Sequence, residues 1–114
     1  MPKVKFIHAE SLVKFSKEAQ EMLDQGWDFY QQWPVNLGEE IGQWMIEGKS
    51  FYEYCLLIAP SAEALNRMAD VHVAEGWDFY ANTVMFKGEL AQWMCKDTSC
   101  ERFKKAVAVE TKKE

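Results

Sequence analysis

Two histidines are the residues in this chain with the widest chemical range, and neither has the neighbours that catalysis requires. His8 lies near the end of a predicted strand, and no cysteine or serine stands at a spacing that would pair with it. His72 falls on the apolar side of a predicted helix, a position that favours a partly buried core residue over a general base. Neither histidine therefore predicts nucleophilic or acid-base catalysis.

Asp28 and Asp78 hold matching places in two copies of one motif, each between large aromatic residues. A carboxylate serves as a general acid or base when burial or a neighbouring charge shifts its pKa. Because both residues alternate with aromatic side chains that should be buried, we expect them to face outward or to lie near the strand start, and to interact with local backbone. We predict no catalytic residue and a protein that is not an enzyme.

The cysteines give no reason to expect a metal or a disulfide framework. Cys55, Cys95 and Cys100 are an odd set in a chain without an apolar secretion signal, which favours reduced thiols in a cytoplasmic protein. The last two are separated by a spacing that matches no common zinc site. We predict no metal and no cofactor.

Composition narrows the classes of partner. The chain has 114 residues with 48% hydrophobic content, enough for one domain that buries roughly two thirds of its unfolded surface. Its net charge is −5, and Arg67 and Arg102 are its only arginines, which argues against nucleic-acid binding through phosphates. No run approaches the roughly 20 apolar residues of a membrane span, so we expect no membrane insertion.

The chain is a duplication. The pentapeptide Gly-Trp-Asp-Phe-Tyr occurs at 26–30 and again at 76–80. Each copy is followed by Gln-Trp-Met, at 43–45 and at 92–94. Two copies of one motif predict two copies of one structural unit.

Each copy predicts a strand, a helix and a hairpin. The strands are residues 4–9 and 54–59, of which the second is apolar throughout and is predicted to be central in the sheet. Apolar residues at helical spacing follow Ser11 and Ser61, whose hydroxyls suit the N-cap, and a glycine ends each helix. Alternating residues then form a hairpin, which in the second copy turns at residues 87–88.

That turn sets the register of the second hairpin. The expected pairs are Phe86 with Glu89, Val84 with Ala91, Asn82 with Trp93 and Tyr80 with Cys95. The helix-facing side then holds Trp77, Phe79, Met85, Leu90 and Met94, with Thr83 and Gln92 able to pair. The first hairpin is one residue longer and has residues 33–38 at its tip.

These elements predict an α+β fold built from duplicated strand-helix-strand-strand units. We expect a six-stranded, mainly antiparallel sheet with both helices on one face. Residues 1–114 would form a single domain of two repeats, 4–47 and 54–96, followed by a short C-terminal helix and tail over 97–114. A capping box that begins at Thr98 marks the start of that helix.

The order of elements resembles a short bacterial and phage family known as domain of unknown function 1737 (DUF1737), here present twice over the two repeats. The residues that carry the resemblance are Ser11 and Leu12 at the helix start, Gly26 and Trp27 after the helix, and Gln43, Trp44 and Met45 at the hairpin end. The family typically has small residues between Gln and Met, whereas this chain has Trp44 and Trp93, so a site at this position would differ. Because the family is uncharacterised, the resemblance implies a fold and no reaction.

The side of the sheet away from the helices is expected to carry four aromatic rings, those of Tyr30, Trp44, Tyr80 and Trp93. An exposed apolar patch of that size is larger than a monomer usually tolerates. We therefore expect this patch to be covered. The cover is either another copy of the chain, in a homodimer or higher oligomer formed sheet to sheet, or the C-terminal helix folded back. The alternative is a groove in which the rings stack a planar ligand such as a nucleobase, although the chain offers a nucleotide few basic residues.

The hairpin tips combine acidic and apolar side chains. The residues concerned are Trp33, Leu37, Glu39, Glu40, Phe86 and Glu89. Acidic groups beside exposed hydrophobic ones suit docking onto a basic, grooved protein partner. The alternative is that the tips pack against the other repeat.

Two hypotheses of function follow. The first is a non-enzymatic, acidic interaction protein that binds and occludes a protein partner, which the phage-family resemblance extends by analogy to an inhibitor of a host or defence protein. The second is a protein that binds and sequesters a nucleotide-like small molecule in aromatic pockets at a subunit boundary.

Overall fold

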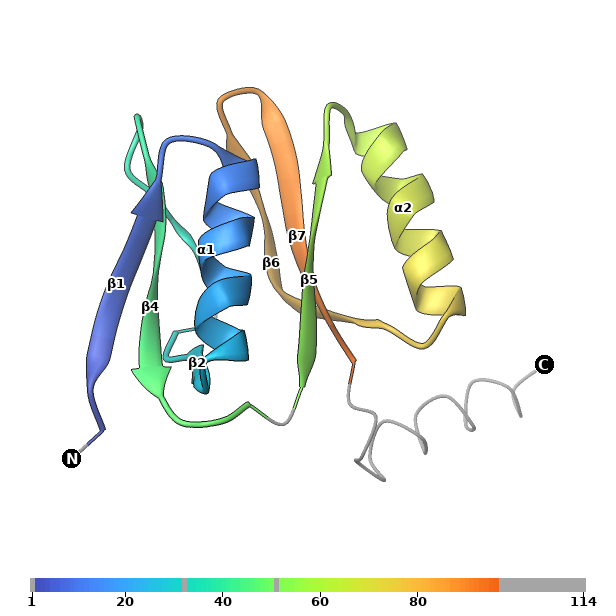
Figure 1. Ribbon diagram of the computed structural model, residues 1–114. Coiled ribbons are helices and arrows are strands. Elements are labelled where there is room, and N and C mark those ends of the chain that lie inside the picture. The colour runs from blue at the N-terminus through green and yellow to red at the C-terminus, as the bar shows by residue number, and fades with distance from the viewer. Residues whose placement is uncertain (1, 32, 51, 97–114) are drawn as a thin grey trace.

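A computed structural model describes residues 2–31, 33–50 and 52–96, and it confirms the α+β class. Two helices and seven strands follow one another along these residues (Figure 1). They are β1 (Val4–Ala9), α1 (Leu12–Asp24), β2 (Trp27–Phe29), β3 (Val35–Asn36), β4 (Ile41–Glu47), β5 (Glu53–Ala59), α2 (Ala62–Ala74), β6 (Asp78–Phe86) and β7 (Glu89–Lys96). The expected C-terminal helix falls outside the described residues.

The strands form two antiparallel sheets rather than the one six-stranded sheet that the pattern predicts. In sheet A, β1 and β2 flank β4, and β3 also pairs with β4. In sheet B, β5 and β6 flank β7. Each repeat forms a separate sheet, because among the described residues its strands pair only with strands of the same repeat. The two sheets meet through side chains, such as the rings of Phe29 and Trp93, whose centroids are 4.9 Å apart.

The predicted helix boundaries are confirmed. The hydroxyl oxygens of Ser11 and Ser61 each accept a hydrogen bond of 3.2 Å from a backbone N–H in the first helical turn. After each helix, Gly26 and Gly76 take φ values of +92° and +101°. Glycine adopts this left-handed region without the steric cost that a Cβ atom brings, so the chain can turn from the helix into the following strand.

The second hairpin keeps the predicted register beside its turn and departs from it farther away. Val84 lies opposite Ala91 as expected, but Tyr80 lies opposite Trp93 instead of Cys95. An irregularity between Tyr80 and Val84, where Ala81 has a φ of +68°, shifts the pairing by two residues. Because side chains alternate with a period of two, this shift leaves each of them on its predicted face.

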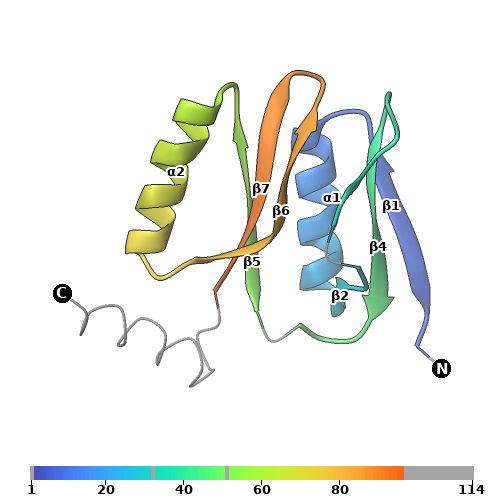
Figure 2. The same ribbon diagram turned by 180° about the vertical axis from the view of Figure 1, so that it is seen from behind.

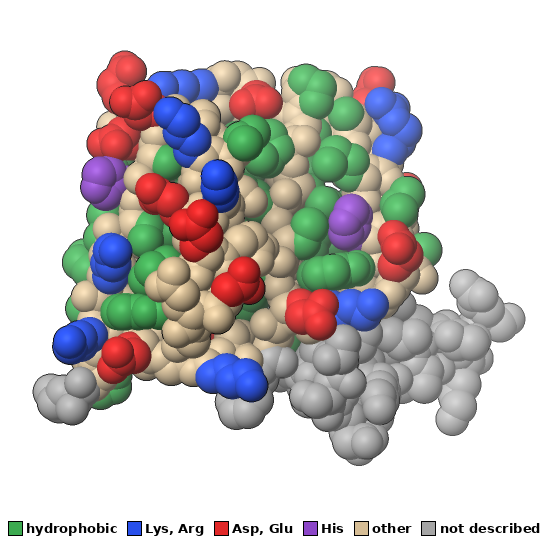
Figure 3. All heavy atoms as spheres, viewed as in Figure 1, with side chains coloured by type: hydrophobic (Ala, Val, Ile, Leu, Met, Phe, Trp, Pro, Cys, Tyr) green, Lys and Arg blue, Asp and Glu red, His purple; other side chains and the backbone are tan. Residues whose placement is uncertain are grey.

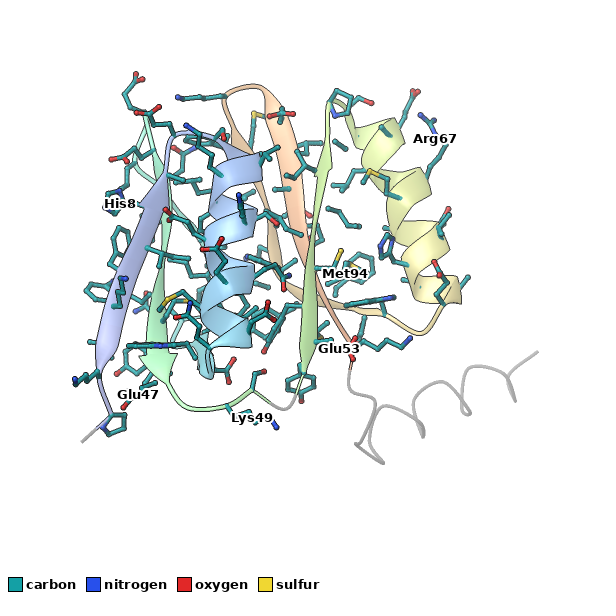
Figure 4. All side chains as sticks on the ribbon, in the orientation of Figure 1. His8, Glu47, Lys49, Glu53, Arg67 and Met94 are labelled. Atoms are coloured by element: carbon teal, nitrogen blue, oxygen red, sulfur yellow. The ribbon has the colours of Figure 1, made fainter. Side chains whose placement is uncertain are left out.

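Helix α1 lies between the two sheets, whereas α2 covers one face of sheet B only (Figures 1 and 2). The buried residues of α1, Phe15 and Ala19 among them, share one core with sheet A and with Tyr54 and Trp93 of sheet B. The core under α2 is smaller and includes Met94, which Figure 4 shows between β5 and α2. The pattern predicts that both helices lie on one face of a single sheet, and this prediction is wrong. The first repeat packs its helix against the second repeat, so each helix has a different environment.

Candidate functional site

Trp93 is buried, so its predicted exposure on an open sheet face is wrong. Only 1% of its surface is accessible. Its ring lies against Phe15 of α1 and Phe29 of β2, with centroid separations of 6.1 and 4.9 Å. Its Nε1–H donates to Gln43 Oε1 at 3.2 Å. The first repeat covers this face of sheet B, which we call the reverse face of sheet B and which carries Trp93 and Tyr54.

Tyr80 and Tyr54 complete the buried aromatic cluster. Tyr80 is half-buried, with its ring 5.0 Å from that of Tyr54 and 5.7 Å from that of Phe29. Burial raises the pKa of both tyrosines above the ordinary value. The Tyr54 hydroxyl donates to Asp28 Oδ1 at 3.4 Å. These phenols remain protonated near neutral pH and act as packing groups between the repeats.

Trp44, the repeat counterpart of Trp93, is 38% exposed. It lies on the face of sheet A that α1 does not cover, opposite Phe6 in the β1–β4 ladder, with the two ring centroids 5.1 Å apart. Tyr30 is 58% exposed and donates its backbone N–H to the Trp44 carbonyl at 3.0 Å. We call this face, with Val4, Phe6, Tyr30 and Trp44, the outer face of sheet A. Two of the four predicted rings therefore lie on an open surface.

Residues 33–40, which we call the hairpin arm, hold exposed apolar side chains on an ordered backbone. Trp33 and Leu37 are each 54% exposed. The Leu37 N–H donates to the Glu40 carbonyl at 2.8 Å, and the Asn36 side chain donates to the Met85 carbonyl at 2.8 Å. Polar contacts therefore hold the arm in place, and its apolar side chains remain free to contact another molecule.

The tip of the second hairpin does not form an equivalent docking surface. Phe86 is 1% exposed and belongs to the core, so its predicted role at a docking tip is corrected. It points to the reverse face of sheet B, where the first repeat covers it. Glu89 opposite it is exposed. The sequence pattern does not show which of the two tips is buried, because both carry apolar residues beside acidic ones.

The acidic residues of the hairpin arm border the outer face of sheet A. Glu39 is exposed, and Glu40 Oε2 lies 2.8 Å from His8 Nδ1. The hydrogen bond to Glu40, followed by the negative charge of that residue, raises the pKa of His8 above its ordinary value. The hydrogen bond between His8, which is labelled in Figure 4, and Glu40 thus joins the hairpin arm to β1, and its strength depends on pH.

Replacing Glu40 by glutamine is expected to return the pKa of His8 toward its ordinary value. The His8–Glu40 pair raises the folded-state pKa, so it contributes stability below about pH 6.5 and loses that contribution as the pH rises through the folded-state pKa. An NMR titration of the His8 ring protons in the wild type and in Glu40→Gln measures the difference. Titration curves that coincide would contradict this pairing in solution.

The other polar groups are engaged in ordinary structural contacts. Asp28 and Asp78 each accept the next residue's backbone N–H at 2.8 Å, which confirms their predicted interaction with local backbone. His72 Nδ1 lies 2.8 Å from the Met68 carbonyl, and its Nε2 lies 3.9 Å from Cys55 Sγ, a contact that sequence spacing did not suggest. Burial raises the pKa of the Cys55 thiol, which disfavours the thiolate that a nucleophile requires.

Positive and negative side chains are interspersed on the surface around His8 and α1, and neither sign is concentrated there. Two hollows beside His8, of about 340 and 420 Å³, are lined by both lysines and glutamates, including Lys17 and Glu18 in the larger one. Figure 3 shows charges of both signs over α1 and hydrophobic side chains gathered over β5 and α2. Within residues 2–31, 33–50 and 52–96, no group of three His, Cys, Asp or Glu side chains could hold a metal ion. Neither helix in those ranges is long and apolar enough to cross a bilayer.

A groove under α2 is the feature that sequence reasoning missed. It has a volume of about 330 Å³ and lies between α2 and strands β6 and β7. Phe79 lines it and is 55% exposed, although its position in the hairpin predicts a ring covered by the helix. The sequence does contain a signal for this groove. Ala62 and Leu65 are smaller than Leu12 and Phe15, the residues at the matching positions of the first repeat. Comparisons with protein-family models, with curated proteins and with solved structures found no match.

Proposed function

We propose that this chain is a non-enzymatic interaction protein that binds a protein partner through the hairpin arm and the adjoining outer face of sheet A. One observation carries the proposal: five large apolar side chains within residues 30–44, three of them aromatic, remain exposed. They are Tyr30, Trp33, Val35, Leu37 and Trp44. Aromatic residues on an open surface are the usual anchors of protein interfaces.

The charges around this surface indicate the chemistry of the partner. Glu39 and Glu40 stand at the end of the hairpin arm, and the whole chain has a net charge of −5. Acidic groups at the rim of an apolar surface favour a partner whose own rim is basic. Binding would occlude that partner's surface. Inhibition of a host or defence protein is a narrower hypothesis that rests on the family resemblance alone.

The alternative function, sequestration of a nucleotide-like molecule between aromatic rings, has less support. Trp93 and Tyr80 pack in the core between the repeats and are not free to stack a ligand. The hollows beside His8 mix acidic and basic side chains, so they offer no concentrated positive charge to a phosphate. Protein binding is therefore the better-supported proposal.

A photo-crosslinking amino acid at position 37, introduced in the cell in which the protein acts, is expected to give an adduct of one discrete mass. The side chain at this position is 54% exposed at the centre of the hairpin arm. The charge reversals Glu39→Lys and Glu40→Lys in the same chain should weaken the adduct, because they repel a basic rim. Denaturing gel electrophoresis and mass spectrometry measure the adduct.

Val13 provides the matched control position. It is 69% exposed on α1 and is not part of the hairpin arm. A crosslinker at position 13 should give no adduct of the same mass. The proposal is wrong if position 37 gives no discrete adduct, or if positions 13 and 37 give the same one.

A further inference from the structure

Trp93 fills a socket that the first repeat provides. The walls of this socket are Phe15 from α1, Phe29 from β2 and Gln43 from β4, and each of the three is at most 7% exposed. The indole contacts both rings, and its Nε1–H reaches the Gln43 amide oxygen at 3.2 Å. An aromatic knob from one repeat thus fills a socket in the other, and this contact helps to join the two halves of the chain.

The second repeat contains the counterpart of that socket, and there it is open. It is the groove of about 330 Å³ under α2, lined by Ala62, Leu65, Asn66, Ala69, Phe79, Thr83, Leu90 and Gln92. In the duplicated sequence, Leu65 corresponds to Phe15, Phe79 to Phe29 and Gln92 to Gln43. The exposures show the difference between the copies, since Phe29 is 7% exposed and Phe79 is 55% exposed.

The first repeat contains the counterpart of the knob, and it is uncovered. Trp44 corresponds to Trp93 in the Gln-Trp-Met motif and is 38% exposed on the outer face of sheet A. Sheet A and α2 lie at opposite ends of the molecule in both ribbon views (Figures 1 and 2). One end therefore carries an indole without a socket, the other carries a socket without an indole, and both are accessible at once.

We propose that a second copy of this chain fills the groove under α2. Trp44 of one copy inserts between α2 and sheet B of the next, and this contact repeats the packing of Trp93 in the first repeat. The inference rests on the proposed function and divides its surface: a second copy occupies the outer face of sheet A, and the partner with a basic rim binds the hairpin arm. Because the two contacting surfaces differ, copies add head to tail, and they form a closed ring or an open filament.

Two single variants and their mixture test the proposal. Trp44→Ala removes the knob and keeps the groove, whereas Ala62→Trp fills the groove from an exposed position and keeps the knob. Size-exclusion chromatography with light scattering should show assemblies larger than a dimer for the wild type, of one size for a closed ring and growing with concentration for an open filament. Each variant alone should be a monomer. Their equimolar mixture should form a dimer with one copy of each, because only one complementary pair of surfaces remains.

Val13→Ala is the control, since it shortens an exposed apolar side chain outside both surfaces, and it should assemble as the wild type does. The proposal is overturned if the wild type is monomeric at every concentration, or if Trp44→Ala assembles as the wild type does. A dimer formed by Ala62→Trp alone also overturns it, because that result indicates a symmetric contact between two outer faces. In that case the hairpin arm is still open to a different partner, and crosslinking from position 37 tests that binding separately.

Discussion

Replacing Trp93 by alanine is expected to lower the free energy of unfolding by about 3–5 kcal/mol, the usual cost of removing a large buried aromatic side chain. The indole is 1% exposed and packs against Phe15, Phe29 and Tyr54. Its loss also leaves Gln43 Oε1 without the donor that reaches it from the second repeat. Urea unfolding followed by circular dichroism measures the change.

Trp44→Ala is the matched control, because it removes the same side chain from the equivalent place in the other repeat. Trp44 is 38% exposed, so its replacement leaves a smaller cavity and should cost clearly less than that of Trp93. The two variants should be compared at one low protein concentration, at which self-association contributes little. Equal losses for the two variants would contradict the unequal burial of the two tryptophans and the packing of the repeats described above.

Replacing Gly42 by alanine is expected to lower the free energy of unfolding by about 1–3 kcal/mol, because it overfills a closely packed site. A Cβ atom at position 42 would meet the Phe6 ring and would lie 2.8 Å from the Ile7 carbonyl oxygen. The ring can rotate away, but the carbonyl belongs to the backbone of β1, so the strand itself must shift. The outer face of sheet A would be disturbed as well, because Phe6 lies beside Trp44.

The double variant Phe6→Ala, Gly42→Ala separates the two contacts. If the backbone contact with Ile7 dominates, adding Gly42→Ala to the Phe6→Ala chain should still lower the free energy of unfolding. The second repeat has Ala91 at the matching place, where a Cβ atom is accommodated at 1% exposure. An unchanged urea midpoint for Gly42→Ala, relative to the wild type, would show that β1 adapts without cost.

Sequence reasoning succeeded for features that depend on a few neighbouring residues. Serine at the N-cap and glycine after each helix act within a single turn, so their residue types suffice to place the helix ends. The hairpin turn at residues 87–88 likewise fixed the nearby pairs. Even the Thr83–Gln92 hydrogen bond was anticipated, and it is present at 2.5 Å.

Features that depend on contacts between the repeats were not predicted. Phe86 and Leu37 stand in similar hairpin contexts, yet Phe86 is 1% exposed and Leu37 is 54% exposed. The irregularity after Tyr80 also went unforeseen, because no residue in the stretch is one that reliably marks such a departure from regular pairing. Helix propensity and alternation describe one element at a time, whereas burial depends on which element packs on which.

The amino-acid order by itself determined a duplicated α+β chain, its helix caps and the faces on which its aromatic residues lie. Only the tertiary structure decided that Trp93 is buried and Trp44 is exposed, although both occupy the same motif. The physical reason is that each repeat has two apolar surfaces. One is the socket between its helix and its sheet, and the other is the aromatic face of the sheet that its own helix does not cover. When two such units are joined in one chain, one socket and one face satisfy each other, and the remaining face and socket are left at opposite ends.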